Sequence, residues 1–139
     1  MADQVYIEDV KVGDEIPKLV KNCNTMQLVM WAAGSGDYYQ IHYDKDFANL
    51  MGLPGVIVHG ALKHAFLGQM LHDWLGDKGQ IKKYGCQYRG MDLPNQDITC
   101  RGVITAKEDN LVQLDIWAEN PNGDKTTPGK ATVILPSRG

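Results

Sequence analysis

The sequence has 139 residues, of which 43% are hydrophobic and 22% charged, and its formal net charge is −3. These values are typical of one soluble globular domain, so residues 1–139 are taken as a single domain. Basic residues are scattered and no apolar run approaches the ~20 residues of a membrane span, so neither a nucleic-acid partner nor a membrane is expected. The N-terminus lacks the pattern of a signal peptide, and three cysteines without CxxC spacing indicate free thiols, which predicts a cytoplasmic location.

The front of the chain is expected to be helical. Asn24 or Thr25 is a suitable N-cap, and apolar residues at helical spacing then predict a short amphipathic helix over residues 25–34. A second short helix is expected to begin after Asp44 and to end at Gly52. No regular element is assigned to the first 20 residues.

Residues 60–75 give the clearest helix prediction. Apolar side chains cover more than half of the helix circumference: Leu62, Phe66, Leu67, Met70, Leu71, Trp74 and Leu75. A helix with this pattern is usually buried on most of its sides. Gly76 is expected to end it.

The back of the chain alternates polar and apolar residues with a period of two. This alternation predicts antiparallel strands with one buried face, and Asn122-Gly123 marks the turn of a hairpin. The alternating segments are residues 84–88, 98–105, 112–118 and 130–135. The expected fold class is α+β, with an antiparallel sheet wrapped around a long central helix.

Asp37 and His42 lie five residues apart in a loop that follows Gly36. An acid beside an imidazole can orient it, raise its basicity or share a water molecule with it, so the pair is a candidate for acid–base catalysis. The alternative is that Asp37 caps the loop and His42 has a structural role. Cys100 is another possible nucleophile, but no base neighbours it in the sequence.

His59 and Gly60 open the long helix. The free N–H groups and the dipole at this helix end favour a developing negative charge, such as a thioester oxygen that becomes enolate-like. His59 alone fits a structural hydrogen bond to backbone. A metal site formed by Asp37, His42, Asp44 and His59 has no supporting ligand spacing, so no metal is expected.

These motifs resemble those of a known family. Ser35-Gly36-Asp37, Ile41-His42-Tyr43-Asp44, Phe47-Ala48 and residues 57–62 are similar to the pattern S-G-D-x-N-P-I-H-x-D-x-x-x-A, followed by V-H-G, of the MaoC-like, (R)-specific enoyl-CoA hydratases. That family has the hotdog fold, and the resemblance extends over about residues 25–135.

The resemblance implies an activity. Asp37 and His42 would activate the water that adds to carbon 3 of a trans-2-enoyl-CoA thioester, and would deliver the proton to carbon 2. Gly60 would donate its backbone N–H to the thioester oxygen. The reverse reaction dehydrates (R)-3-hydroxyacyl thioesters, as in fatty acid metabolism, without a cofactor.

The resemblance also implies an assembly. Relatives of this length form dimers whose sheets join, with the substrate at the subunit interface. A homodimer or a dimer of dimers is therefore expected, with a heteromer as the alternative. The carrier of the acyl group can be CoA or acyl carrier protein.

The sequence departs from the family pattern where Tyr39-Gln40 replaces Asn-Pro. Tyr39 is much larger than Asn and would fill part of an acyl tunnel, whereas Gln40 lacks the fixed φ of proline. Tyr38, Tyr39, Gln40 and His59 are the expected substrate-contacting residues.

Two other functions stay open. A non-catalytic hotdog subunit would bind an acyl-CoA or support an active partner. The departure from the family pattern at Tyr39-Gln40 is the feature that favours this alternative. A hotdog thioesterase would need a carboxylate aimed at the thioester carbonyl, often from the central helix. Residues 60–75 contain one acid, Asp73, which lies near the C-terminal end of the predicted helix and is poorly placed for this role.

Overall fold

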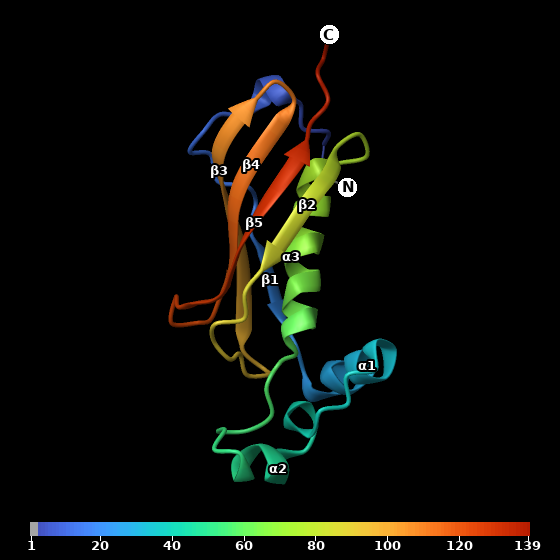
Figure 1. Ribbon diagram of the computed structural model, residues 1–139, viewed down its shortest axis with the longest axis vertical. Coiled ribbons are helices and arrows are strands. Elements are labelled where there is room, and N and C mark those ends of the chain that lie inside the picture. The colour runs from blue at the N-terminus through green and yellow to red at the C-terminus, as the bar shows by residue number, and fades with distance from the viewer. Residues whose placement is uncertain (1–2) are drawn as a thin grey trace.

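A computed structural model describes residues 3–139. One five-stranded antiparallel sheet, in the order β1-β3-β4-β5-β2, curls around the long helix α3, Gly60–Leu75 (Figure 1). The strands are β1, Leu19–Asn22; β2, Gln80–Cys86; β3, Asp97–Glu108; β4, Leu111–Glu119; and β5, Lys125–Ile134. The predicted α+β class and the sheet around a central helix are confirmed.

The core lies between α3 and the concave face of the sheet. Along β4, every second side chain points inward and is at most 1% exposed, as at Val112, Leu114, Ile116 and Ala118. On α3, Leu67 and Leu71 are fully buried and Met70 is 1% exposed. Because apolar surface removed from water stabilises the fold in proportion to its area, this contact between helix and sheet is its main source of stability.

Strand β1 was missed by sequence analysis. It has four residues, pairs with β3 from Leu19 opposite Cys100 to Asn22 opposite Asp97, and forms an edge of the sheet. Its side chains are at best half-buried. So short a segment shows too little alternation to be separated from loop, and its partner strand defines it.

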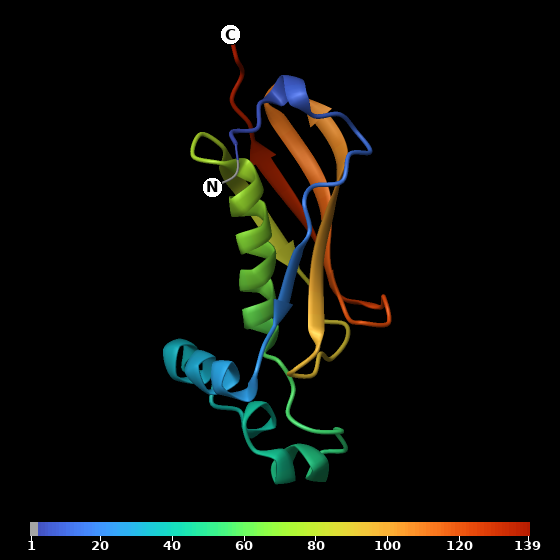
Figure 2. The ribbon, with the colours of Figure 1, turned by 180° about the vertical axis from the view of Figure 1, so that it is seen from behind.

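The two short helices predicted for the front of the chain are present as α1, Thr25–Ser35, and α2, Lys45–Leu50. The Asn24 side chain accepts from the N–H of Gln27, and the Asp44 side chain accepts from the N–H of Phe47, so each helix has the predicted cap. Gly36 ends α1 with a φ of 79°, a conformation that favours glycine. Figure 2 shows both helices beyond the N-terminal end of α3.

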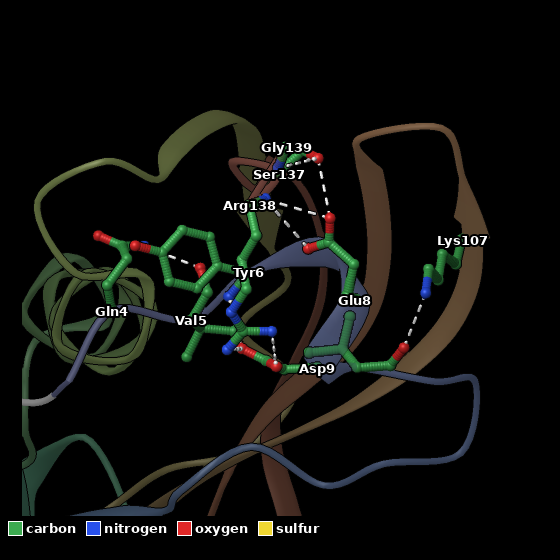
Figure 3. Close-up of polar contacts among 10 residues, drawn as sticks. Gln4, Val5, Tyr6, Glu8, Asp9, Lys107, Ser137, Arg138 and Gly139 are labelled. Carbon is green, nitrogen blue, oxygen red and sulfur yellow. Dashed lines mark hydrogen bonds and ion pairs between the residues drawn. The ribbon is translucent and has the colours of Figure 1, made fainter.

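The chain ends meet at the other end of the molecule (Figure 3). The Arg138 guanidinium binds both carboxylate oxygens of Asp9, and Glu8 accepts from the hydroxyl of Ser137. Lys107 donates to the carbonyl of Val10 at 2.9 Å, which ties the first loop to β3. Within residues 3–139, no helix is both long enough and apolar enough to cross a bilayer.

Candidate active site

The candidate site begins where α1 ends. After Gly36 the chain turns sharply, and the N–H of Asp37 donates to the Ser35 hydroxyl at 3.2 Å. A single turn of 3-10 helix, Gln40–His42, then places His42 between α1 and α2. The loop lies near the N-terminal end of α3 (Figure 1), and it brings the predicted acid and imidazole beside His59, the residue that precedes this helix.

His42 is 7% exposed, and a hydrogen bond to backbone fixes the orientation of its ring. Its Nδ1 lies 2.8 Å from the carbonyl oxygen of Ile57, and because a carbonyl can only accept, Nδ1 carries the proton. In the neutral ring, Nε2 is therefore the nitrogen that carries the lone pair. It faces the carboxylate of Asp37, with 3.8 Å between Nε2 and Oδ2. The Asp37 side chain is 46% exposed, so the pair opens to solvent on that side.

Two acceptors that face each other at this distance do not bind each other directly. A carboxylate oxygen and an imidazole lone pair each need a donor, and 3.8 Å is too long for a hydrogen bond between them. One water molecule can donate a hydrogen to each acceptor at once. The arrangement therefore fits the binding and deprotonation of water.

His59 lies directly behind His42. The two imidazole rings stack with their centroids 3.8 Å apart and their planes 18° from parallel. His59 is fully buried, and its Nε2 lies 3.3 Å from the carbonyl oxygen of Asp37, to which it donates. Within residues 3–139, its Nδ1 has no hydrogen-bond partner. Burial, and then the adjacent His42, lower the pKa of His59, so it stays neutral.

The ligand atoms of Asp37, His42 and His59 lie within 4.8 Å of one another, so the metal alternative has a geometric basis. The stack of rings opposes it. An imidazole binds a metal in its own plane at about 2.0 Å, and two nearly parallel planes cannot direct their lone pairs to one ion. Coordination would require one ring to leave the stack, so the geometry favours hydrogen bonding.

Gly60 is the first residue of α3, and His59 precedes it as an N-cap without a side-chain hydrogen bond. The first N–H groups of a helix have no partner inside that helix, and they carry its positive dipole end. A Cβ on Gly60 would lie 2.9 Å from the Tyr88 ring, closer than real contacts allow. Glycine at this position therefore leaves room for the Tyr88 ring, which lies against this helix end.

The other predicted contacts lie along the same loop. Tyr38 and Tyr39 are 58% and 46% exposed. The Tyr39 ring stands edge-on to His42 at 6.4 Å and to Phe47 at 6.0 Å. Gln40 is exposed and supports the loop through its carbonyl, which accepts from Asp44 at 2.8 Å. That Tyr38, Tyr39, Gln40 and His59 contact substrate stays a prediction.

Sequence analysis missed Tyr88 and the ring stack. Tyr88 follows β2 and lies far from Gly60 in the chain, and no motif links the two. The stack of His42 on His59 depends on the path of the loop. Cys100 does not act as the nucleophile that was considered, because it is fully buried and burial raises the pKa of its thiol to about 12.

The antiparallel sheet curled around α3 is the hotdog fold. The R-hydratase PhaJ1 from Pseudomonas aeruginosa, in its unliganded form, has the same fold, with a TM-score of 0.88 over 97% of this chain and 88% of that chain, at 19% identity. A family profile of the MaoC like domain matches residues 7–116. The chain belongs to this family, as its motifs predicted, and the predicted enzyme class, a hydro-lyase, is that of the family.

Two curated relatives cover much of the chain. One is the fatty acid synthase beta subunit TOXC of Cochliobolus carbonum, which is 29% identical over 74% of this chain, while the match covers 5% of that protein. The other is the 3-oxo-4,17-pregnadiene-20-carboxyl-CoA hydratase beta subunit of Mycobacterium tuberculosis, 27% identical over 91% of this chain and 96% of that protein.

The buried, neutral His59 predicts a pH-dependent stability. Below its ordinary pKa of 6.5 the unfolded chain takes up a proton that folded His59 resists, so stability should fall as the pH decreases. His59→Gln should make the melting temperature depend less on pH between about pH 7 and about pH 5. His72→Gln, at an exposed position of α3, should match the wild type in thermal melts followed by circular dichroism. An equal pH dependence in all three proteins would contradict this role of His59.

The contact of Tyr88 with Gly60 predicts a specific rescue. Gly60→Ala should displace the Tyr88 ring, because the new methyl group would lie 2.9 Å from it, and should lower both activity and melting temperature. The double variant Gly60→Ala with Tyr88→Ala should regain melting temperature over Gly60→Ala alone. If the losses of melting temperature in the two single variants add in the double variant, the new methyl group does not clash with the Tyr88 ring.

Proposed function

We propose that this protein hydrates trans-2-enoyl-CoA thioesters and, in reverse, dehydrates (R)-3-hydroxyacyl-CoA thioesters. The observation that carries the proposal is the pair of facing acceptors, Asp37 Oδ2 and His42 Nε2, 3.8 Å apart beside the N-terminus of α3. Membership of the MaoC-like family supports the reaction type. The (R) configuration follows from the resemblance of the motif around Asp37 and His42.

The geometry supplies each step of the addition. Water held by Asp37 and His42 attacks carbon 3 of the enoyl thioester while His42 Nε2 takes one of its protons. The electron pair of the double bond moves to the thioester oxygen as an enolate, which the N–H of Gly60 stabilises. Carbon 2 then takes up a proton from the pair, which restores the carbonyl and the neutral imidazole.

The state of His42 suits this task. Because Nδ1 donates to Ile57, the ring presents Nε2 as a base in the resting protein. Once Nε2 has accepted a proton, the negative charge of the Asp37 carboxylate, 3.8 Å away, stabilises the imidazolium. His59 stays neutral behind it and adds no opposing charge.

We also propose a homodimer or a dimer of dimers in the cytoplasm, in which acyl-CoA lies at the subunit interface. Strand β2 is a free edge of seven residues that can pair with a second copy. Large apolar side chains beside the site are exposed in the isolated chain: Met26, Val29, Met30, Leu50 and Met51. A heteromer is the alternative, since the mycobacterial relative is named a beta subunit.

The acid–base pair is tested by conservative substitution. Asp37→Asn removes the negative charge of the carboxylate and His42→Gln removes the basic ring nitrogen, and each should lower kcat by about 10²–10⁴-fold. Activity is followed as the loss of enoyl-thioester absorbance with crotonyl-CoA and longer enoyl-CoAs, and the product configuration by chiral chromatography. Asp46→Asn, on exposed α2, is the control and should keep wild-type activity. Wild-type rates in either site variant would overturn the assignment, and release of free CoA would indicate a thioesterase.

Tyr39 is tested as a determinant of substrate size. Tyr39→Asn removes a ring that stands beside His42, so kcat/KM for long or branched enoyl-CoAs should rise about tenfold relative to crotonyl-CoA. Tyr43→Asn is a matched control, because Tyr43 is 45% exposed against 46% for Tyr39. The hypothesis fails if both variants keep the wild-type preference across the chain-length series.

A further inference from the structure

A buried ion pair lies one helical turn behind the candidate site. Lys63, on the first turn of α3, and Asp92, in the segment before β3, are each 2% exposed in their side chains. Lys63 Nζ lies 2.9 Å from Asp92 Oδ2 and also donates to the carbonyl of Gly90 at 3.1 Å. The Thr126 hydroxyl of β5 donates to the same carboxylate oxygen at 2.6 Å.

This pair is a costly way to fill a core. Removing two charges from water costs free energy that their attraction barely repays, and apolar side chains of similar volume often give equal or greater stability. A cation near a helix N-terminus also opposes the helix dipole. Within residues 3–139, Asp92 Oδ1 has no hydrogen-bond partner, which adds to the cost.

The backbone around the pair leads directly to the site. The carbonyl of Asp92 accepts from the N–H of Val58 at 2.8 Å, and the N–H of Ile57 donates to Ile41 at 3.0 Å. The carbonyl of Ile57 is the acceptor that fixes the tautomer of His42. The segment 57–58, immediately before His59 and Gly60, is therefore held between the Asp92 segment and the residue that precedes His42.

Lys63 reaches the same segment a second way. Its backbone N–H donates to the carbonyl of His59 at 3.2 Å, which closes the first turn of α3. Its side chain meanwhile fixes Asp92, whose carbonyl holds Val58. Lys63 therefore holds the turn before Gly60 in two ways, through its backbone N–H and through the bond of its side chain to Asp92.

We propose that Lys63 and Asp92 are positioning residues that hold the Val58–Gly60 turn in its catalytic geometry. The proposal rests on the proposed function, in which the Gly60 N–H stabilises the enolate and His42 is the base. Both side chains of the ion pair are 2% exposed. The pair acts through the backbone of Val58, and its loss would move the Gly60 N–H and the acceptor of His42 together.

The test compares a buried with an exposed ion pair. Lys63→Met with Asp92→Leu replaces the pair by apolar side chains, and the double variant should melt higher than either single variant. Its kcat should nevertheless stay about 10–100-fold below wild type with KM little changed, because reacting groups are misplaced and not lost. The control, Lys130→Met with Asp115→Leu, removes a surface pair 3.6 Å apart and should keep wild-type kcat.

A second readout does not depend on activity. In ¹H–¹⁵N spectra, the amide of Gly60 and the ring nitrogens of His42 should shift in the Lys63/Asp92 double variant and stay in place in the control. Wild-type kcat together with unshifted signals would overturn the proposal. If the double variant does not fold, Thr126→Val takes its place, because it removes one donor to Asp92. The signals of Gly60 and His42 should then shift in Thr126→Val. Wild-type kcat with unshifted signals in that variant would overturn the proposal. If the wild-type protein shows no hydratase activity, the proposed function fails while these spectra still decide the positioning role.

Discussion

The burial of α3 is the constraint on which the rest of the structure depends. The apolar face of the helix packs against the curled sheet along its length, while Ala61, Gln69, His72 and Asp73 are exposed. Once packed, the helix cannot slide without exposing Leu67 or Leu71 to solvent. Its N-terminus at Gly60 is thereby fixed in space, and side chains that pack against this terminus are held in defined positions.

The site combines this fixed helix end with a loop that has little regular structure of its own. Four interactions secure the loop: the Nδ1 bond of His42 to Ile57, the stack of His42 on His59, the bond of His59 to the Asp37 carbonyl, and the cap of α2 by Asp44. Each joins the loop to itself or to the residues just before α3. The loop is therefore positioned by the helix terminus, and the bond of Val58 to the Asp92 carbonyl links that terminus to the segment before β3.

Sequence patterns predicted those features of the fold and the site that depend on residues close together in the chain. The apolar periodicity of α3, the alternation in β3 and β4, and the Asp37, His42 and Gly60 motif all lie within short windows of sequence. β1 was missed because pairing with β3 defines it. The Lys63–Asp92 pair joins residues 29 apart, and a lysine on a helix that also carries His64, Gln69, His72 and Asp73 looks like a surface residue until its partner is located. Such features are set by tertiary contacts, which no local pattern encodes.

The site is rigid on one side and open on the other. His42 and His59 are buried against α3, whereas Asp37, Tyr38 and Tyr39 are exposed. The Tyr39 side chain forms none of the bonds that hold His42, because the contact between these residues in the 3-10 turn uses the Tyr39 backbone carbonyl. The shape of the open side can therefore change without disturbing the acid–base pair. This separation lets Tyr39-Gln40 replace the usual Asn-Pro while Asp37 and His42 keep their arrangement.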